Sequence, residues 1–201
     1  FGGDCTPTEA VKTVIPLLTE AIPEALHFIR TSAAKMDSLL TGLLRLSRSG
    51  RAALTIDSLD MKGLMARVID ACEFQISESG TELEVAQLPP CRGDVVQVNQ
   101  VFSNLLDNAL HYLDPDRPGT IRISGRVEGE RSIYCVEDNG IGIAPAHQGV
   151  IFEVFHRLDP AETEGEGLGL AIIRQALGRL SGDIWVESER GRGSRFYVAL
   201  P

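Results

Sequence analysis

The chain has 201 residues, of which 43% are hydrophobic and 23% charged, a composition typical of soluble globular proteins. Its length suits one domain with a smaller module beside it. The formal net charge of -9 argues against a nucleic-acid-binding protein, because the phosphates of DNA or RNA would be repelled by such a surface. No apolar run reaches the roughly 20 residues needed to cross a bilayer, so we expect no membrane segment in this chain.

The cysteines argue against a metal or disulfide scaffold. Cys5, Cys72, Cys91 and Cys135 are scattered and never form a CxxC pair. This spacing disfavours zinc ligation, and a disulfide framework is unusual in a chain of this size. The sequence therefore favours free thiols in a reducing cytoplasm.

A long helix is the first element expected along the chain. Apolar residues recur at alternating steps of four and three, as in a helix of a coiled coil or helical bundle. They are Ile22, Leu26, Ile29, Ala33, Met36, Leu40 and Leu43. Pro23 suits the first turn of this helix, and Gly50 suits an end near residue 49. Because one helix cannot bury such a seam, we expect a homodimer or a truncated helical hairpin.

Six further elements are expected after residue 57. Helices over residues 61–78, 93–113 and 167–182 combine with a strand at 81–89 and hairpins at 120–140 and 183–201. The first hairpin turns at Glu128 and Gly129. This order predicts an α+β fold, a two-layer sandwich with one mixed sheet under a helical layer. The chain then divides into a partial helical segment (1–57) and a globular domain (58–201).

The helix over residues 93–113 carries two amides that suggest a site. Asn104 and Asn108 are four residues apart and share one helical face. Surface exposure or a helix-packing hydrogen bond would explain either residue alone. The alternative is that both amide oxygens face a hard cation such as Mg²⁺, which prefers oxygen ligands.

The segment VEDNGIGI, residues 136–143, ends a strand with an acid followed by spaced glycines. Asp138, Gly140 and Gly142 form either a plain turn or a place where a ligand approaches the backbone beside one carboxylate. The sequence pattern alone leaves both readings open.

A second glycine-rich segment, GEGLGLAI, opens a helix with Gly165, Gly167 and Gly169. It lacks the Lys and Ser/Thr of a P-loop and the spacing of a dinucleotide fingerprint. It does leave backbone N–H groups at a helix N-terminus, where phosphates bind. The segment GRGSRF, with Gly191 and Gly193, is explained by a turn nearly as well as by any function.

Taken in order, five segments resemble the N, G1, F, G2 and G3 boxes of sensor histidine kinases, the gyrase-like ATP-binding kinases of two-component signalling. They are NLLDNALHY, EDNGIGI, IFEVFHRL, GEGLGLAI and GRGSRF. Each box is weak alone, but five in order and spacing are specific, and the resemblance covers residues 58–201. The helix ending MDSLLTGLLRLSRSG resembles the second helix of that family's dimerisation hairpin.

The resemblance implies roles for individual residues. Asp138 would accept a hydrogen bond from the adenine amine, with Gly140 and Gly142 letting the base lie against the backbone. Asn108 and Asn104 would hold Mg²⁺ against the triphosphate. The nucleotide-binding residues implied are Asn104, Asn108, His111, Tyr112, Asp138, Gly140, Gly142, Ile143, Phe155, Gly165, Gly167, Leu168, Gly169 and Leu170.

The resemblance also implies a lid over the phosphates. Phe152 and Phe155 would anchor its start, and Arg157 would sit in it near the phosphates. The catalytic residues implied are Asn104 and Arg157. Because the middle of this segment is polar, we expect it to move until nucleotide binds.

The chain departs from the family pattern in two places. His111 stands where many members have Lys, which leaves open whether it contacts the phosphates. The phosphoacceptor motif, a His beside an acid and followed by Pro, is not found, because His27, His147 and His156 lack that context. We therefore expect the acceptor helix to be missing, so that this chain binds nucleotide without phosphorylating itself.

The function implied is transfer of the γ-phosphoryl of Mg-ATP to a histidine, and onward to the receiver domain of a response regulator. The full-length protein would be a homodimer through the helical hairpin. It would be cytoplasmic, or the cytoplasmic part of a membrane-bound sensor. Two alternatives remain: a non-catalytic ATP-binding regulatory module, and a gyrase-type ATPase, against which the seam helix and the short lid speak.

Overall fold

The computed structural model describes residues 15, 17–33, 36, 53–154 and 167–201. The chain divides into two compact units, Phe1–Arg45 and Leu46–Pro201, which are considered separately.

The described part of the first unit is helical. A π-helical turn η1 (Leu17–Ala21) leads directly into an α-helix over residues 22–33. Pro23 is the second residue of this α-helix, so it lies in the first turn, as expected from the sequence. The predicted seam residues Ile22, Leu26, Ile29 and Met36 are 46–65% exposed. Apart from Met36, the predicted continuation to residue 49 lies outside the described residues.

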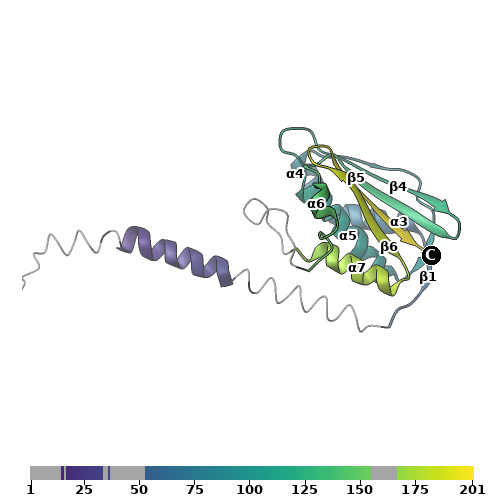
Figure 1. Ribbon diagram of the computed structural model, residues 1–201, viewed down its shortest axis with the longest axis horizontal. Coiled ribbons are helices and arrows are strands. Elements are labelled where there is room, and N and C mark those ends of the chain that lie inside the picture. The colour runs from purple at the N-terminus through teal and green to yellow at the C-terminus, as the bar shows by residue number, and fades with distance from the viewer. Residues whose placement is uncertain (1–14, 16, 34–35, 37–52, 155–166) are drawn as a thin grey trace, which may run out of the picture. The chain divides into compact units, whose positions relative to one another are not determined.

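A five-stranded sheet forms one layer of the second unit (Figure 1). In spatial order the strands are β2 (Glu82–Val85), β4 (Thr120–Glu128), β5 (Arg131–Asp138), β7 (Gly193–Leu200) and β6 (Asp183–Glu189). Strands β2 and β4 run parallel and the other pairs antiparallel, so the predicted mixed sheet is confirmed. Both predicted hairpins are present, and the first turns at Gly129 with φ of 61°.

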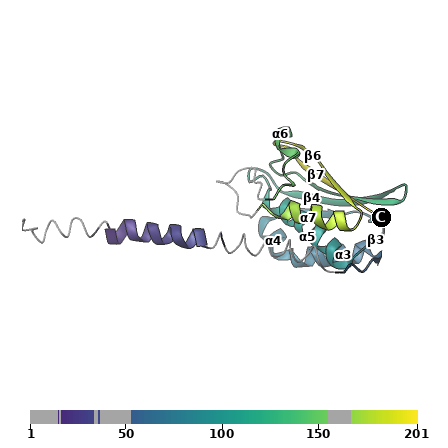
Figure 2. The same ribbon diagram turned by 60° about the horizontal axis from the view of Figure 1, so that its bottom comes forward.

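Three helices cover one face of this sheet: α3 (Met61–Ala71), α5 (Val95–His111) and α7 (Gly169–Arg179) (Figure 2). Helix α5 begins at Asp94, whose carboxylate accepts hydrogen bonds from the N–H groups of Val96 and Gln97. Its apolar stripe is buried against the sheet, where Phe102 meets the ring of Tyr134 edge-on at 5.4 Å between centroids. The two-layer α+β sandwich predicted from the sequence is confirmed.

Several local predictions were wrong. The helix expected over residues 61–78 is two helices, because the chain breaks at Cys72 before α4 (Glu73–Ser79), which buries no residue. The strand expected over residues 81–89 ends at Val85. The sequence also missed a small antiparallel sheet of β1 (Asp57–Leu59) and β3 (Cys91–Gly93), and the short helix α6 (Pro145–Gln148).

Two further expectations concern side chains and the membrane. The three cysteines in the described residues, Cys72, Cys91 and Cys135, are free thiols. Within the same residues, no helix combines the length and the hydrophobicity needed to span a bilayer.

Candidate functional site

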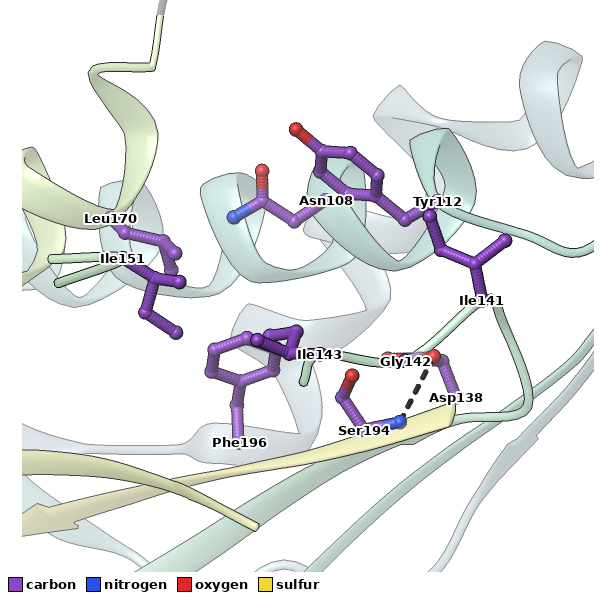
Figure 3. A pocket seen from close by; sticks show the side chains of 10 residues that line it. All are labelled: Asn108, Tyr112, Asp138, Ile141, Gly142, Ile143, Ile151, Leu170, Ser194 and Phe196. Atoms are coloured by element: carbon purple, nitrogen blue, oxygen red, sulfur yellow. Dashed lines mark hydrogen bonds between the residues drawn. The ribbon is translucent and has the colours of Figure 1, made fainter. Parts of the chain in front are cut away.

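One pocket lies between the helical layer and the end of the sheet (Figure 3). Helix α5 forms one side, β7 forms the other, and the loop after β5 and the start of α7 close the ends. The pocket has about 550 Å³ of space free of protein atoms, part of it open to solvent. Its lining residues are Asn108, Tyr112, Asp138, Ile141, Gly142, Ile143, Ile151, Leu170, Ser194 and Phe196.

Asp138 supplies a buried carboxylate to this largely apolar pocket. It is the last residue of β5 and is only 8% exposed. Its Oδ1 accepts hydrogen bonds from the N–H of Gly140 at 2.9 Å and of Ser194 at 3.2 Å. Burial raises the pKa of this carboxyl to about 6, against the lowering effect of the two N–H donors and of the Arg117 charge. At neutral pH the pocket therefore contains an anionic hydrogen-bond acceptor.

The loop that follows Asp138 is held on both sides by main-chain bonds. Ile141 N–H donates to the carbonyl of Tyr112 at 3.0 Å, and the Ile141 carbonyl accepts from Gly191 N–H at 2.7 Å. Arg117 donates from Nε to the Asn139 carbonyl and from Nη2 to the Gly140 carbonyl, at 2.8 and 2.7 Å. These bonds fix the direction of the loop and, through it, the position of the carboxylate.

The glycines of this loop are required by the protein's own backbone. A Cβ on Gly140 would overlap the carbonyl of Tyr112, and one on Gly142 would overlap the carbonyl of Glu189. Gly142 also has φ of +67°, which favours glycine. Close packing of protein backbone thus explains both residues without a ligand, although Gly142 does line the pocket.

The two predicted amides share one face of α5 but are used differently. Asn108 lines the pocket, and within the described residues its buried Nδ2 has no hydrogen-bond partner. Asn104 instead accepts from Gln100 Nε2 at 3.0 Å and donates to the Gly169 carbonyl at 3.4 Å. Of these two amides, only Asn108 offers the pocket a group without a partner in the described residues.

The start of α7 adds backbone donors beside Asn108. Gly167 has φ of +66°, Leu168 is buried, and Leu170 lines the pocket. No side chain in the described residues caps the first turn of α7, whose leading N–H groups have no partner within the helix itself. A Cβ on Gly169 would lie 3.7 Å from Asn108 Oδ1, which shows how closely the helix start approaches that amide.

The remaining predicted residues divide into three groups. Tyr112 and Ile143 line the pocket. His111 does not line it; the side chain is exposed at the end of α5, with its ring edge-on to Tyr112 at 4.9 Å. Phe155, Arg157 and Gly165 lie outside the described residues, whereas Phe152 is half-buried and packs against the core.

Sequence reasoning missed the contribution of β7 to the pocket. Ser194 and Phe196 both line it, and they come from a segment interpreted as a turn. Their two-residue spacing, continued by Val198 in the core, is the signal that could have placed them on the inner face of the sheet.

The sequence model of a family described as histidine kinase-, DNA gyrase B-, and HSP90-like ATPase matches residues 93–201. This chain belongs to that family. Among similar members, the methanogenesis regulatory histidine kinase FilI of Methanothrix harundinacea is 35% identical over 178 residues, which are 88% of this chain and 20% of FilI. The alginate biosynthesis sensor protein KinB of Pseudomonas aeruginosa is 30% identical over 209 residues, 98% of this chain and 35% of KinB.

A solved structure agrees with these relatives. Full-length ShkA in complex with AMPPNP matches with a TM-score of 0.72 and 28% identity, over 91% of this chain and 39% of ShkA. The chain corresponds to the catalytic ATP-binding region of sensor histidine kinases, and neither a non-catalytic module nor a gyrase-type ATPase is favoured. It spans only 20% and 35% of the lengths of FilI and KinB.

Proposed function

We propose that the full-length protein transfers the γ-phosphoryl of Mg-ATP to a histidine and then to an aspartate of a response-regulator receiver domain. The observation that carries the proposal is one pocket that holds a buried carboxylate, Asp138, and an amide, Asn108, beside the start of α7; within the described residues Asn108 Nδ2 has no hydrogen-bond partner and no side chain caps α7. The Asp138 carboxylate suits a base with an exocyclic amine, and the Asn108 amide and the start of α7 suit phosphates.

Adenine would occupy the apolar part of the pocket next to Asp138. Ile141, Ile143 and Phe196 offer apolar surface for the faces of a planar base. Both hydrogen bonds found for the carboxylate end on Oδ1, so within the described residues Oδ2 remains for an amine donor. Charge-assisted bonds of this kind are about twice as strong as neutral ones.

The triphosphate and Mg²⁺ would lie toward Asn108 and the start of α7. Asn108 fits this role because its buried Nδ2 has no hydrogen-bond partner within the described residues. A phosphate would supply one, or a cation if the amide is turned so that its oxygen takes that place. Within the described residues no group of three His, Cys, Asp or Glu side chains could hold a metal ion, so amide and phosphate oxygens would be its ligands. Bound Mg²⁺ would neutralise developing charge on the phosphates.

The roles of Asn104, Arg157 and the lid residues Phe155 and Gly165 remain part of this proposal. Asn104 would contribute to the metal site only by giving up its bond to Gln100. His111 would reach the phosphates only by leaving its exposed position beside Tyr112.

The wider organisation is also proposed. The apolar seam that starts at Ile22 would pair with a second helix of a dimerisation hairpin, because its residues are exposed in the described part of the chain. We assign residues 1–57 to this segment and 58–201 to the catalytic domain. A cytoplasmic location would give this domain access to ATP and to the receiver domain of a response regulator.

The test combines binding and transfer. Calorimetry with ATP, in Mg²⁺ and in EDTA, should show binding that strengthens with Mg²⁺. Incubation with γ-labelled ATP and a separately produced acceptor hairpin should then label the hairpin histidine. Binding without transfer would support the regulatory module, steady turnover without an acceptor would support a gyrase-type ATPase, and no binding would refute all three.

A further inference from the structure

Two serines on neighbouring strands form a hydrogen-bond network behind the pocket. Ser188 of β6 lies directly opposite Ser194 of β7 in the strand register. Their hydroxyl oxygens are 2.9 Å apart, so one hydroxyl donates to the other. Ser194 is 6% exposed and lines the pocket, whereas Ser188 lies behind it (Figure 3 shows Ser194 beside Asp138).

The other partners of Ser188 decide which serine is the donor. Ser188 Oγ accepts from Ile143 N–H at 2.7 Å and donates to the carbonyl of Gly193 at 2.8 Å. A hydroxyl has one hydrogen and two lone pairs. Because the Gly193 carbonyl can only accept, it takes the single hydrogen of Ser188. Ser194 must therefore donate its own hydrogen to the remaining lone pair of Ser188.

This arrangement decides whether the pocket offers hydrogen-bond donors or acceptors to a ligand. With its hydrogen directed at Ser188, Ser194 has only lone pairs left, and its Oγ has no other partner in the described part of the chain. The adjacent Asp138 carboxylate is also an acceptor without a hydrogen. This side of the pocket thus presents acceptors only, so a ligand must bring donors.

We propose that Ser188 is a positioning residue that makes the site select a 6-amino purine over a 6-oxo purine, an inference that rests on the proposed ATP binding. The amino group brings two hydrogens to the acceptors, whereas a 6-oxo purine places there a carbonyl oxygen with no hydrogen to give and carries its hydrogen on the neighbouring N1. Ser188 acts through Ser194: it accepts the hydrogen of the Ser194 hydroxyl and so keeps that hydrogen directed away from the pocket.

The test measures the preference for ATP over ITP, which differ at this position of the base. Dissociation constants of both Mg-nucleotides are measured for the wild type, Ser188→Ala, Ser194→Ala and the double variant. In Ser188→Ala the Ser194 hydrogen is released and can donate to the inosine carbonyl. The preference for ATP should fall by about 3- to 10-fold, the equivalent of one neutral hydrogen bond.

The double variant separates positioning from a general structural role. The bond from Ile143 N–H to Ser188 should affect both nucleotides alike, so Ser188 should change the preference only through Ser194. Removing Ser188 in the Ser194→Ala background should therefore leave the preference unchanged. Ser77→Ala, on the exposed surface of α4, is the matched control and should retain the wild-type preference. Ser194→Ala alone should also lower the preference, which keeps the test decisive if Ser188→Ala does not fold.

Several outcomes would overturn the inference. Equal weakening of both nucleotides by Ser188→Ala would show that the serine only supports the loop. The inference would also be overturned if Ser194→Ala left the preference for ATP over ITP unchanged. It would likewise be overturned if Ser188→Ala changed that preference equally in the wild-type and Ser194→Ala backgrounds. If the variants retain a wild-type preference for ATP, this inference fails alone; if the wild type binds neither nucleotide, the proposed function fails with it.

Discussion

Replacement of Asp138 by Asn should make the nucleotide-free protein more stable while weakening its affinity for ATP. The carboxylate is 8% exposed, and its pKa is raised from 3.8 to about 6 because burial disfavours the charged form. An Asn side chain keeps an oxygen that can accept from the N–H groups of Gly140 and Ser194, but it has no charge to desolvate.

The size of this effect follows from the pKa. A shift of about two units corresponds to about 3 kcal/mol against the ionised carboxylate at neutral pH. Between about pH 4 and pH 6 the unfolded chain has lost this proton while the folded chain retains it. The free energy of unfolding of the wild type therefore falls as pH rises through this window and levels off above it.

The stability assay is urea denaturation of the wild type and Asp138→Asn at pH 5 and pH 8. The advantage of the variant should be larger at pH 8 by about 1–2 kcal/mol. Asp70→Asn, on the exposed side of α3, controls for the loss of one negative charge. A wild type more stable than Asp138→Asn at pH 8, or a difference independent of pH, would contradict the reasoning.

Binding should change in the opposite direction. Loss of a charge-assisted hydrogen bond to the base costs about 1.5–3 kcal/mol, so ATP should bind about 10- to 150-fold more weakly to Asp138→Asn. Wild-type affinity should also fall as pH drops below about 6, where Asp138 gains its proton. Titration calorimetry over this pH range checks both; equal affinities at pH 8 would remove Asp138 from the site.

Three further tests, two of them with a matched control substitution, concern the geometry. Gly193→Ala places a Cβ against the main chain after β5 at φ of +108° and should lower the free energy of unfolding by about 2 kcal/mol or more. Gly178 on α7 has open space around it, so Gly178→Ala should raise the free energy of unfolding by about 0.5–1 kcal/mol. If Gly193→Ala and Gly178→Ala changed the denaturation midpoint equally, this account would be refuted. Asn108→Leu removes the unpaired buried amide, so stability should hold or rise by about 1 kcal/mol while Mg²⁺-dependent ATP binding disappears in calorimetry. Arg117→Met breaks two hydrogen bonds to the loop after β5, so it should lower the free energy of unfolding by about 1–3 kcal/mol and weaken ATP binding. Arg122→Met removes only an exposed ion pair and should lower the free energy of unfolding by less than about 1 kcal/mol. Similar losses in the two variants would contradict this prediction.

Elements with strong local signals could be predicted from the sequence. Helix α5 has an apolar stripe of helical period and begins at Asp94, whose side chain caps it, so its existence and limits were nearly correct. The hairpin turn at Gly129 follows two alternating strands. Asn108, Asp138 and Leu170, named from the ordered boxes, line one pocket; that they bind nucleotide stays a prediction.

Features set by distant contacts could not be predicted. Strands β1 and β3 have three residues each, too few to show a period, and they exist because they pair with each other. The partners of Ser188 and Arg117 include residues 45 and 23 positions away in the chain. Asn104 and Asn108 share a helical face, yet Asn104 is already paired, with Gln100 and with the carbonyl of Gly169, which lies 65 positions away in the chain.

The position of β7 between β5 and β6 affects how the domain is made on the ribosome. Strand β6 emerges before β7 but has no partner strand in the described sheet until β7 pairs with it. The N–H that Ser194 gives to Asp138 arrives at the same step. A pocket completed by Ser194 and Phe196 forms only once β7 has paired between β5 and β6, so nucleotide binding would add its full stabilisation by mass action only after that step.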